Sequence, residues 1–360
     1  MSLWRWSEFL PEVPSAYRLD IGTGQTPLIR SLRIGPSAGL PNLWFKLETA
    51  NPTGSYKDRF GAVAISHMIA HGRNRCVGTS SGNSGAALAA HCAAAGIRCE
   101  IATIITAPAN KVDQMRIYGA RVFKVDEFGL DPEVTRDTFE HLKQMGSAPG
   151  AALQISAYCY SPTGMEGVKT ISYELNAQMS APCHHVFVPA GGGGLALAVT
   201  RGFEDLVAAG TIGTMPRMRI IQPAGNDTIA TPLNEGAAEA RSIAQSTSRI
   251  SGLQCPSVLD GHDLIHAARR SSGSGHLVSN EAVWEMQQRL AFEEGVFCEP
   301  AGAVATAGAV LAGREGRIAK DENVVCLVTG SGFKDEPSAR RIAERTECPT
   351  LTYEQLRRVH

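Results

Sequence analysis

The sequence predicts an α/β protein built from two three-layer α/β domains with mostly parallel sheets. Short apolar strand patterns alternate with helical patterns along most of the chain. Glycine is frequent, at 37 residues, which suits many tight turns between strands and helices. A length of 360 residues allows two domains with a sizeable core.

The first half of the chain supplies the first alternation. Residues 43–47 form a short apolar run typical of a strand, and residues 55–71 carry apolar side chains at helical spacing. The elements expected next are a strand at 76–79, a helix at 84–95, a strand at 99–105, a helix at 109–118 and a strand at 121–125. Strands separated by helices favour a parallel sheet with helices on both faces.

The second half repeats the pattern. The elements expected there are strands at 185–189, 218–222 and 324–328 and helices at 195–206, 280–294 and 299–312. Residues 234–275 are rich in Ser, Gly and Ala and weakly periodic, so we expect loops. Together the two halves predict two domains with a cleft between them.

Composition excludes several classes of function. The formal net charge of −1 gives no electrostatic reason to expect nucleic acid or a membrane surface as partner. The apolar runs are too short for a bilayer, and the N-terminus lacks the apolar core of a signal peptide. The nine cysteines are scattered without a CxxC pair. We therefore expect neither zinc, nor any other metal, nor disulfides, and a reducing cytoplasm as the compartment.

Three polar or glycine-rich loops fall where a predicted strand ends and a helix begins. They are NPTGSYKDRF at 51–60, TSSGNSG at 79–85 and GGGG at 191–194. Open α/β sheets bind ligands at such positions. Backbone N–H groups at a helix start are unpaired, and the helix dipole favours an anion there.

Four consecutive glycines indicate a backbone that approaches a ligand closely, most often a phosphate. The pattern GxGxxA also fits Gly191, Gly193 and Ala196, as in dinucleotide-binding turns. That interpretation requires an acidic residue after the next strand, but Gln222 ends it, so a nicotinamide cofactor is disfavoured. The second loop carries hydroxyls and an amide that suit a carboxylate, although the same residues also cap helices.

Five motifs in order resemble the fold-type II pyridoxal phosphate enzymes, the tryptophan synthase β group. They are NPTGSYKDR, SSGNSG, the GGGG turn, EPAGA at 299–303 and TGSGFKD at 329–335, and they span nearly the whole chain. NPTGSYKDR, TGSGFKD and EGVKTISYEL at 166–175 are most similar to threonine synthase. The resemblance implies pyridoxal 5'-phosphate in the cleft and a homodimer. It also implies a large cofactor-binding domain of residues 1–80 and 158–360, with a smaller mobile domain of residues 81–157 that closes over the substrate.

The resemblance also implies roles for individual residues. Lys57 would form the Schiff base with the cofactor and then act as the base at the substrate Cα. Asn83 would bind the cofactor's 3-hydroxyl oxygen, and Ser81, with the backbone of Asn83 and Ser84, would bind the substrate carboxylate. The remaining cofactor contacts would come from Gly191, Gly192, Gly193 and Gly194 at the phosphate, from Thr329 at the pyridine nitrogen, and from Ser331 as a weaker candidate there.

One segment departs from threonine synthase. That family has N-S-x-N-P-x-R before its E-G-Q-K-T motif, and the Asn, Ser and Arg bind the phosphate of O-phosphohomoserine. Here the segment reads YCYSPTGM at 158–165, which places Tyr158 and Cys159 at the Asn-Ser pair and Gly164 at the arginine. Glycine cannot replace an arginine fork. We therefore expect Tyr158, Tyr160 and Gly164 to line the substrate side and to suit a smaller or less charged leaving group.

The predicted function is that of a pyridoxal phosphate-dependent lyase of the threonine synthase-like group, acting on a small amino acid by Cα deprotonation and elimination or replacement. O-phosphohomoserine remains a candidate substrate. The alternatives are a serine or threonine dehydratase, an ammonia-lyase, and a cysteine or cysteate synthase that performs β-replacement. A non-catalytic amino-acid-binding protein is a further alternative, although such a protein does not need a Schiff-base lysine.

Overall fold

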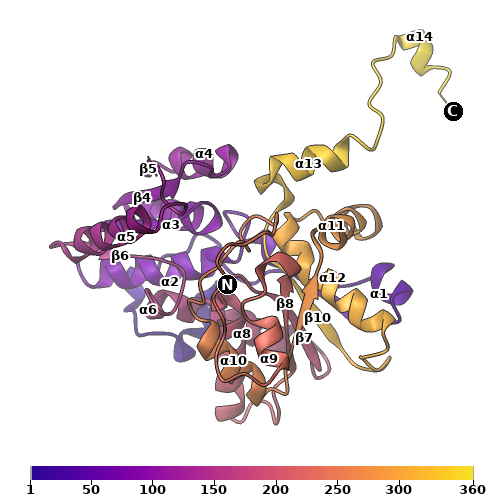
Figure 1. Cartoon of the computed structure of the whole chain (residues 1–360), viewed down its shortest axis with the longest axis horizontal. Coiled ribbons are helices and arrows are strands. Elements are labelled where there is room, and N and C mark those ends of the chain that lie inside the picture. The colour runs from indigo at the N-terminus through magenta and orange to yellow at the C-terminus, as the bar shows by residue number, and fades with distance from the viewer. Residues whose placement is uncertain (1, 360) are drawn as a thin grey trace.

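The computed structural model describes residues 2–359, which form two sheets with helices packed on them (Figure 1). The larger sheet has the strand order β1-β2-β10-β7-β8-β9, and only its β1–β2 pair is antiparallel. The smaller sheet, β5-β4-β3-β6, is parallel throughout. The strands are β1 Leu28–Arg30, β2 Leu43–Leu47, β3 Arg75–Thr79, β4 Arg98–Ile104, β5 Arg121–Val125, β6 Ala151–Leu153, β7 His185–Pro189, β8 Arg217–Pro223, β9 Ser274–Val278 and β10 Val324–Val328.

Helices connect and cover these strands. The α-helices are α1 Ile34–Ser37, α2 Lys57–Ala70, α3 Asn83–Ala95, α4 Ala109–Ile117, α5 Pro132–Ser147, α6 Pro162–Met165, α7 Thr170–Gln178, α8 Gly194–Ala208, α9 Ala230–Asn234, α10 Gly261–Arg270, α11 Asn280–Glu294, α12 Pro300–Arg314, α13 Glu336–Ala343 and α14 Tyr353–Leu356. Short 3-10 helices occur at η1 Leu3–Phe9, η2 Ser15–Tyr17, η3 Glu48–Ala50, η4 Glu166–Lys169, η5 Ala224–Asn226 and η6 Gly332–Lys334. Figure 1 shows the segment with α14 extended away from the body. Among the described residues, no helix has both the length and the apolar character needed to cross a membrane.

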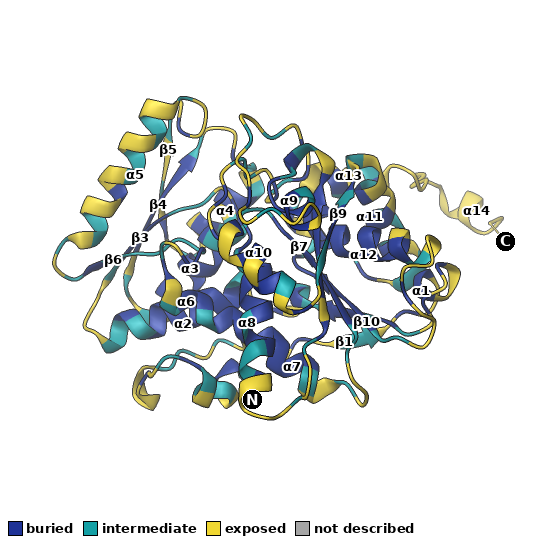
Figure 2. Ribbon diagram, turned by 60° about the horizontal axis from the view of Figure 1, so that its bottom comes forward, coloured by how far each residue is buried: buried dark blue, intermediate teal, exposed yellow. Residues whose placement is uncertain are grey.

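The central strand β7 shows why the larger sheet is buried on both faces. All five of its residues are buried. Val186 and Val188 point into the apolar cluster that contains α8 and α10, whereas Phe187 points into the cluster around α11 and α12. Because side chains alternate along a strand, a strand buried at every position needs a helical layer on each face. The buried colour of α2, α8 and α12 in Figure 2 matches this arrangement.

The predicted fold class is confirmed, and several elements match the prediction residue for residue. These are the strands at 43–47, 121–125, 185–189 and 324–328 and the helix at 280–294. The expectation of loops over 234–275 was wrong in part, because α10 and the start of β9 lie there. Sequence analysis also gave no element for α5, which begins after Asp131, whose side chain accepts hydrogen bonds from the backbone N–H groups of Glu133 and Val134.

The smaller sheet begins earlier than the predicted domain boundary at residue 81. Its strand β3 starts at Arg75, and its last strand in the chain, β6, ends at Leu153. Helices α3 and α4 cover one face of this sheet and α5 packs on the other, while α2 of the larger unit packs against α3. Movement of the smaller unit stays a prediction.

A buried cluster of charges fixes the first turn of α2. The Arg59 side chain is fully buried and donates hydrogen bonds to Glu48 and to Glu174 at 2.7 to 2.8 Å. Lys46 on β2 donates to the same Glu174 carboxylate at 2.6 Å. Two cations and two carboxylates therefore balance, and they join β2, η3 and α7 to the turn that follows Lys57.

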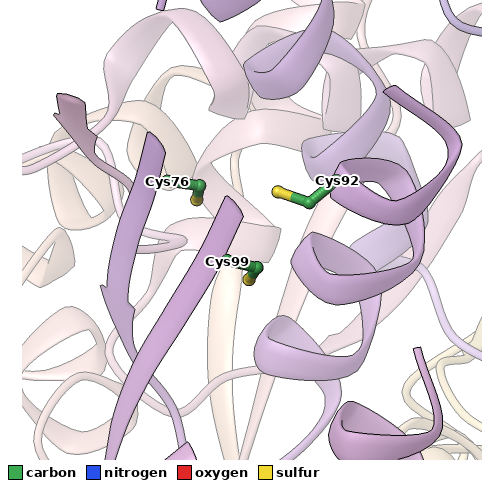
Figure 3. A group of neighbouring side chains, drawn as sticks. All are labelled: Cys76, Cys92 and Cys99. Carbon is green, nitrogen blue, oxygen red and sulfur yellow. The ribbon is translucent and has the colours of Figure 1, made fainter. Parts of the chain in front are cut away.

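Three cysteines far apart in the sequence meet inside the smaller unit (Figure 3). Cys76 on β3, Cys99 on β4 and Cys92 on α3 have Sγ atoms that all lie within 4.8 Å of one another. Register explains part of this contact, since Cys76 and Cys99 are direct partners on neighbouring strands. Hydrogen bonding to the other two thiols, together with burial, raises the pKa of Cys92. Buried thiols in an apolar cluster pack as small hydrophobic groups.

Candidate cofactor and substrate site

A cavity of about 290 Å³ lies where strands of both sheets end, and all three predicted loops line it. Lys57 comes from the start of α2, and Ser81 to Ser84 span the end of the β3–α3 loop and the first two residues of α3. The glycines 191–194 follow β7, and Thr329 follows β10. The structure therefore brings together residues as far apart in the sequence as Lys57 and Thr329.

The position of Lys57 depends on bonds from the preceding turn to the loop after β10. The N–H of Tyr56 donates to the carbonyl of Thr329 at 3.1 Å, and Ser55 forms an isolated bridge with Gly330. The Nζ atom of Lys57 then points into the cavity and donates to Ser156 Oγ at 2.7 Å. Ser156 Oγ lies 2.6 Å from Ser84 Oγ. Lys57 is thus held by hydroxyls in the cavity.

The glycine loop has the geometry of a phosphate cradle. Gly193 has a φ of +98°, which only glycine adopts without strain, and α8 begins at the next residue without a side-chain cap. A Cβ atom at Gly192 would lie 2.6 Å from a methyl of Leu259, and one at Gly194 would lie 2.8 Å from Asp260 Oδ2. The uncapped N–H groups of a 15-residue helix therefore face the cavity across a bare backbone.

A second set of polar groups crosses the cavity from one unit to the other. Asn83 Nδ2 donates to Glu299 Oε1 at 2.6 Å, and Lys111 Nζ lies 2.9 Å from Glu299 Oε2. The Lys111 and Glu299 side chains are each only 3% exposed, so the pair is shielded from water. Asn83 Oδ1 is buried and has no hydrogen-bond partner among the described residues. A buried amide oxygen in this state requires a donor or polar ligand group nearby.

Two further residues shape the site, and sequence analysis missed both. Ser156 holds Lys57 directly, but it stands outside the aligned segment 158–165. The Asp260 carboxylate accepts from the N–H groups of Tyr158 and Cys159 at 2.8 and 3.0 Å, and its own N–H donates to Gly192 at 2.9 Å. It therefore ties the 155–159 loop to the glycine loop. Asp260 lies in the segment expected to be loops, and nothing in its local sequence marks it.

The expectation that Tyr158 lines the substrate side was wrong. Its ring is 8% exposed and packs in the core, with the Arg201 guanidinium of α8 at 4.3 Å from the ring centre. Burial, together with the charge of Glu166, raises the pKa of the Tyr158 hydroxyl. The residues that reach the cavity here are Ile155, Ser156 and Ala157, just before the segment 158–165, so the ungapped alignment placed that segment out of register.

Tyr160, Gly164 and Ser331 also lie outside the cavity. Tyr160 and Gly164 line a separate hollow beside α2, and a Cβ atom at Gly164 would lie 2.7 Å from the Phe60 ring. Glycine at 164 therefore serves the close packing of α6 on α2. The N–H of Ser331 donates to the carbonyl of Gly54 at 2.8 Å, and Ser331 lines another surface hollow. Of the two candidates for the pyridine nitrogen, Thr329 is therefore the one that lines the cavity.

Fold and site together define a two-unit α/β protein whose cavity brings a lysine amine and a glycine loop suited to phosphate into one ligand site. The chain belongs to the family of pyridoxal-phosphate dependent enzymes, whose model matches residues 19–330. It is 31% identical to threonine synthase of Methanocaldococcus jannaschii over 97% of this chain and 85% of that relative. It is also 31% identical to threonine synthase of Mycobacterium bovis over 91% of this chain and 90% of that relative.

A solved structure supports the fold independently. Threonine deaminase isoform 2 of Solanum lycopersicum matches with a TM-score of 0.75 at 20% identity, covering 96% of this chain and 94% of that chain. The protein is therefore a fold-type II enzyme of the threonine synthase-like lyase group, and its cofactor is pyridoxal phosphate. The residues fit this cofactor, since Lys57, the glycine cradle and the unpaired Asn83 oxygen line one cavity.

Proposed function

We propose that the protein removes the Cα proton of a small amino acid and expels a group from the substrate side chain. The observation that carries this proposal is the bond from Lys57 Nζ to Ser156 Oγ inside the cavity that the glycine loop closes. When bound, pyridoxal phosphate supplies the electron sink that makes the Cα proton removable. Lys57 is the Schiff-base residue of this proposal.

Cofactor binding, substrate binding and proton transfer are each assigned to groups of the chain. Glycines 191–194 and the α8 N-terminus bind the cofactor phosphate. Asn83 Oδ1 and Thr329 meet polar groups of the cofactor ring, while Glu299 orients the Asn83 amide. Ser81 and the backbone N–H groups that begin α3 hold the substrate carboxylate. Lys57 Nζ accepts the Cα proton, and the hydrogen bond to Ser156 holds that amine in position.

The leaving group is proposed to be small and uncharged, as in serine or threonine. No arginine lines the cavity among residues 2–359, and its cations are Lys57 and Lys111. Lys111 is already neutralised by Glu299 at 2.9 Å. A phosphate ester would therefore lack the arginine fork that binds such groups best. The threonine synthase relatives favour O-phosphohomoserine as the second candidate, with Ser84, Ser156 and Lys57 as its phosphate contacts.

The test has two parts. Purified protein should be yellow, Lys57→Ala should lose that absorbance, and the exposed control Lys143→Ala should keep it. The wild-type enzyme is then offered serine, threonine, diaminopropionate, O-phosphoserine and O-phosphohomoserine, with keto acid, ammonia and phosphate measured separately. Keto acid from serine or threonine supports the proposal. Phosphate release with threonine formation would establish the second candidate, and a colourless wild-type protein would refute both.

The assembly and the compartment stay predictions. Support for a reducing cytoplasm comes from the nine cysteines, all of which are free. The homodimer rests on resemblance alone, and sedimentation of the holoenzyme tests it directly.

A further inference from the structure

A second cavity lies in the larger unit, away from the strand ends that form the cofactor site. Its volume is about 240 Å³, and it is lined by Arg219 on β8, Ser274 and His276 on β9, and Arg317 beyond α12. Strand β9 and helix α12 are labelled in Figure 2. Helix α12 runs between the two sites, since Glu299, the residue before its start, lines the cofactor cavity and Ala312 near its end lines this one.

The positive charge at this cavity exceeds the negative charge. The Arg219 guanidinium bonds to two uncharged groups, His185 Nδ1 at 3.1 Å and Ser274 Oγ at 2.5 Å. No carboxylate of the described chain lies within 4 Å of it. The nearby carboxylates pair with other groups. Glu315 pairs with Arg317. Glu322 pairs with Arg217 at 2.9 Å and lies 3.1 Å from His185. A partly buried guanidinium without a counter-charge is costly unless a ligand supplies one.

The directions of the side-chain hydrogen bonds leave a hydroxyl proton free to donate into the cavity. Arg317 donates to His276 Nδ1 at 2.8 Å, so the proton of the neutral ring is on Nε2, which donates to Ser274 Oγ at 2.9 Å. Ser274 already accepts from Arg219, which leaves its hydroxyl proton to donate. Both polar atoms of the Asn234 amide are hydrogen-bonded to the Gly275 backbone, since Nδ2 donates to its carbonyl at 2.9 Å and Oδ1 accepts from its N–H at 2.8 Å.

The histidine is neutral at physiological pH and adds no charge of its own. Burial, with the charges of Arg317, Arg219 and His185, lowers the pKa of His276 to about 4. The cavity thus offers the Arg219 guanidinium, which has no carboxylate partner, the Arg317 guanidinium, which also pairs with Glu315, and a hydroxyl donor. This donor set is complementary to an oxyanion, which accepts hydrogen bonds at every oxygen.

We propose that this cavity binds a small oxyanion, the phosphate or carboxylate group of a metabolite, through Arg219, Arg317 and Ser274. A volume of about 240 Å³ is larger than inorganic phosphate needs, since a water takes roughly 30 Å³, so the group would carry a few carbon atoms. The site is separate from the cofactor cavity and does not depend on the proposed reaction.

The experiment uses the holoenzyme, so that the glycine loop is already filled by the cofactor. Calorimetric titrations with inorganic phosphate and with succinate distinguish the two sources of oxyanion. Binding of either at about one per chain is expected, with at least a tenfold weaker affinity in Arg219→Gln and in Ser274→Ala. Arg314→Gln, an exposed arginine at the end of the same helix, serves as the matched control and should bind like wild type.

A second measurement does not depend on variants. The imidazole pKa of His276, followed by NMR in wild-type holoenzyme, should rise when the anion binds, because the anion offsets the charge of the two arginines. Absence of binding by both anions would overturn the proposal. An equal affinity in Arg219→Gln and Arg314→Gln, or an unchanged His276 pKa at saturation, would also overturn it.

Discussion

Replacement of Glu174 by glutamine tests whether the buried charge cluster fixes the start of α2. The Glu174 carboxylate accepts from Arg59 at 2.7 and 2.8 Å, from Lys46 at 2.6 Å and from the Gln25 N–H at 2.7 Å. The substitution keeps the shape and removes one of two negative charges, which leaves a net positive charge in a site closed to water. Breaking a buried ion pair in this way costs about 3–5 kcal/mol of unfolding free energy.

The assay is urea unfolding of the holoenzyme at neutral pH, with two controls. Arg340→Gln removes a surface pair with Glu336, whose partners are 69% and 64% exposed, and should cost at most about 1 kcal/mol. The double variant Lys46→Met with Glu174→Gln restores neutrality and should recover most of the loss. If Glu174→Gln costs no more than Arg340→Gln, the cluster does not hold the fold and the reasoning is refuted.

The same carboxylate predicts a pH dependence. Burial alone would raise the pKa of Glu174, but Arg59 and Lys46 outweigh it and lower that pKa to about 2. A carboxyl whose pKa is lower in the folded protein adds to the unfolding free energy at any pH above its pKa in the unfolded chain, about 4.5. That contribution is lost as the pH falls from about 4.5 toward 2. The Glu174→Gln variant should lack this part of the acid-induced loss.

Three further outcomes are expected. Gly193→Ala should weaken cofactor binding more than Gly192→Ala in spectral titrations. The φ of +98° at residue 193 costs a residue with a side chain about 1–2 kcal/mol, whereas the atom nearest to a Cβ at residue 192 is the end of the flexible Leu259 side chain. Ser156→Ala should lower kcat by about 10- to 100-fold while absorbance is kept, since leaving one partner of a buried hydrogen bond unpaired costs about 1–3 kcal/mol, and an unchanged kcat would contradict its role. Burial raises the pKa of Cys159 to about 11, so its alkylation rate should climb from about pH 8 to about pH 10, and a plateau by about pH 9 would contradict this.

The sequence was sufficient for elements whose pattern is local. Strands such as 185–189 are short runs of apolar residues, and the helix at 280–294 lies between a capping serine and a glycine. The loops at Lys57 and 191–194 were found because they lie where a strand ends, which fixes their place in any parallel sheet. The edge strand β9 was not found, since SGHLV has only weak alternation and is bounded by glycine and serine.

The parts that sequence could not predict depend on contacts between distant segments. Ser156 and Asp260 are ordinary polar residues until the chain folds and brings them to the lysine and the glycine loop. Tyr158 was misplaced because a shift of two or three residues in a loop changes which side chain reaches the cavity. The Lys111–Glu299 pair joins positions 188 residues apart, and although Glu299 begins the EPAGA motif, nothing local marks Lys111 as its partner.

The two sides of the cavity come from different stretches of chain, and this separates two kinds of evolutionary change. Lys57 and the glycine loop follow strands of the larger sheet, whereas Ser81, Ser84 and Ser156 lie within or next to the segment that builds the smaller sheet. Under the proposed roles, substitutions within that single continuous segment can alter which amino acid is accepted while Lys57 and the glycine loop stay unchanged, provided that Asn83 is kept. A chimera that exchanges residues 75–157 between relatives that share Asn83 should keep the lysine and the glycine loop of one parent and take its substrate preference from the other.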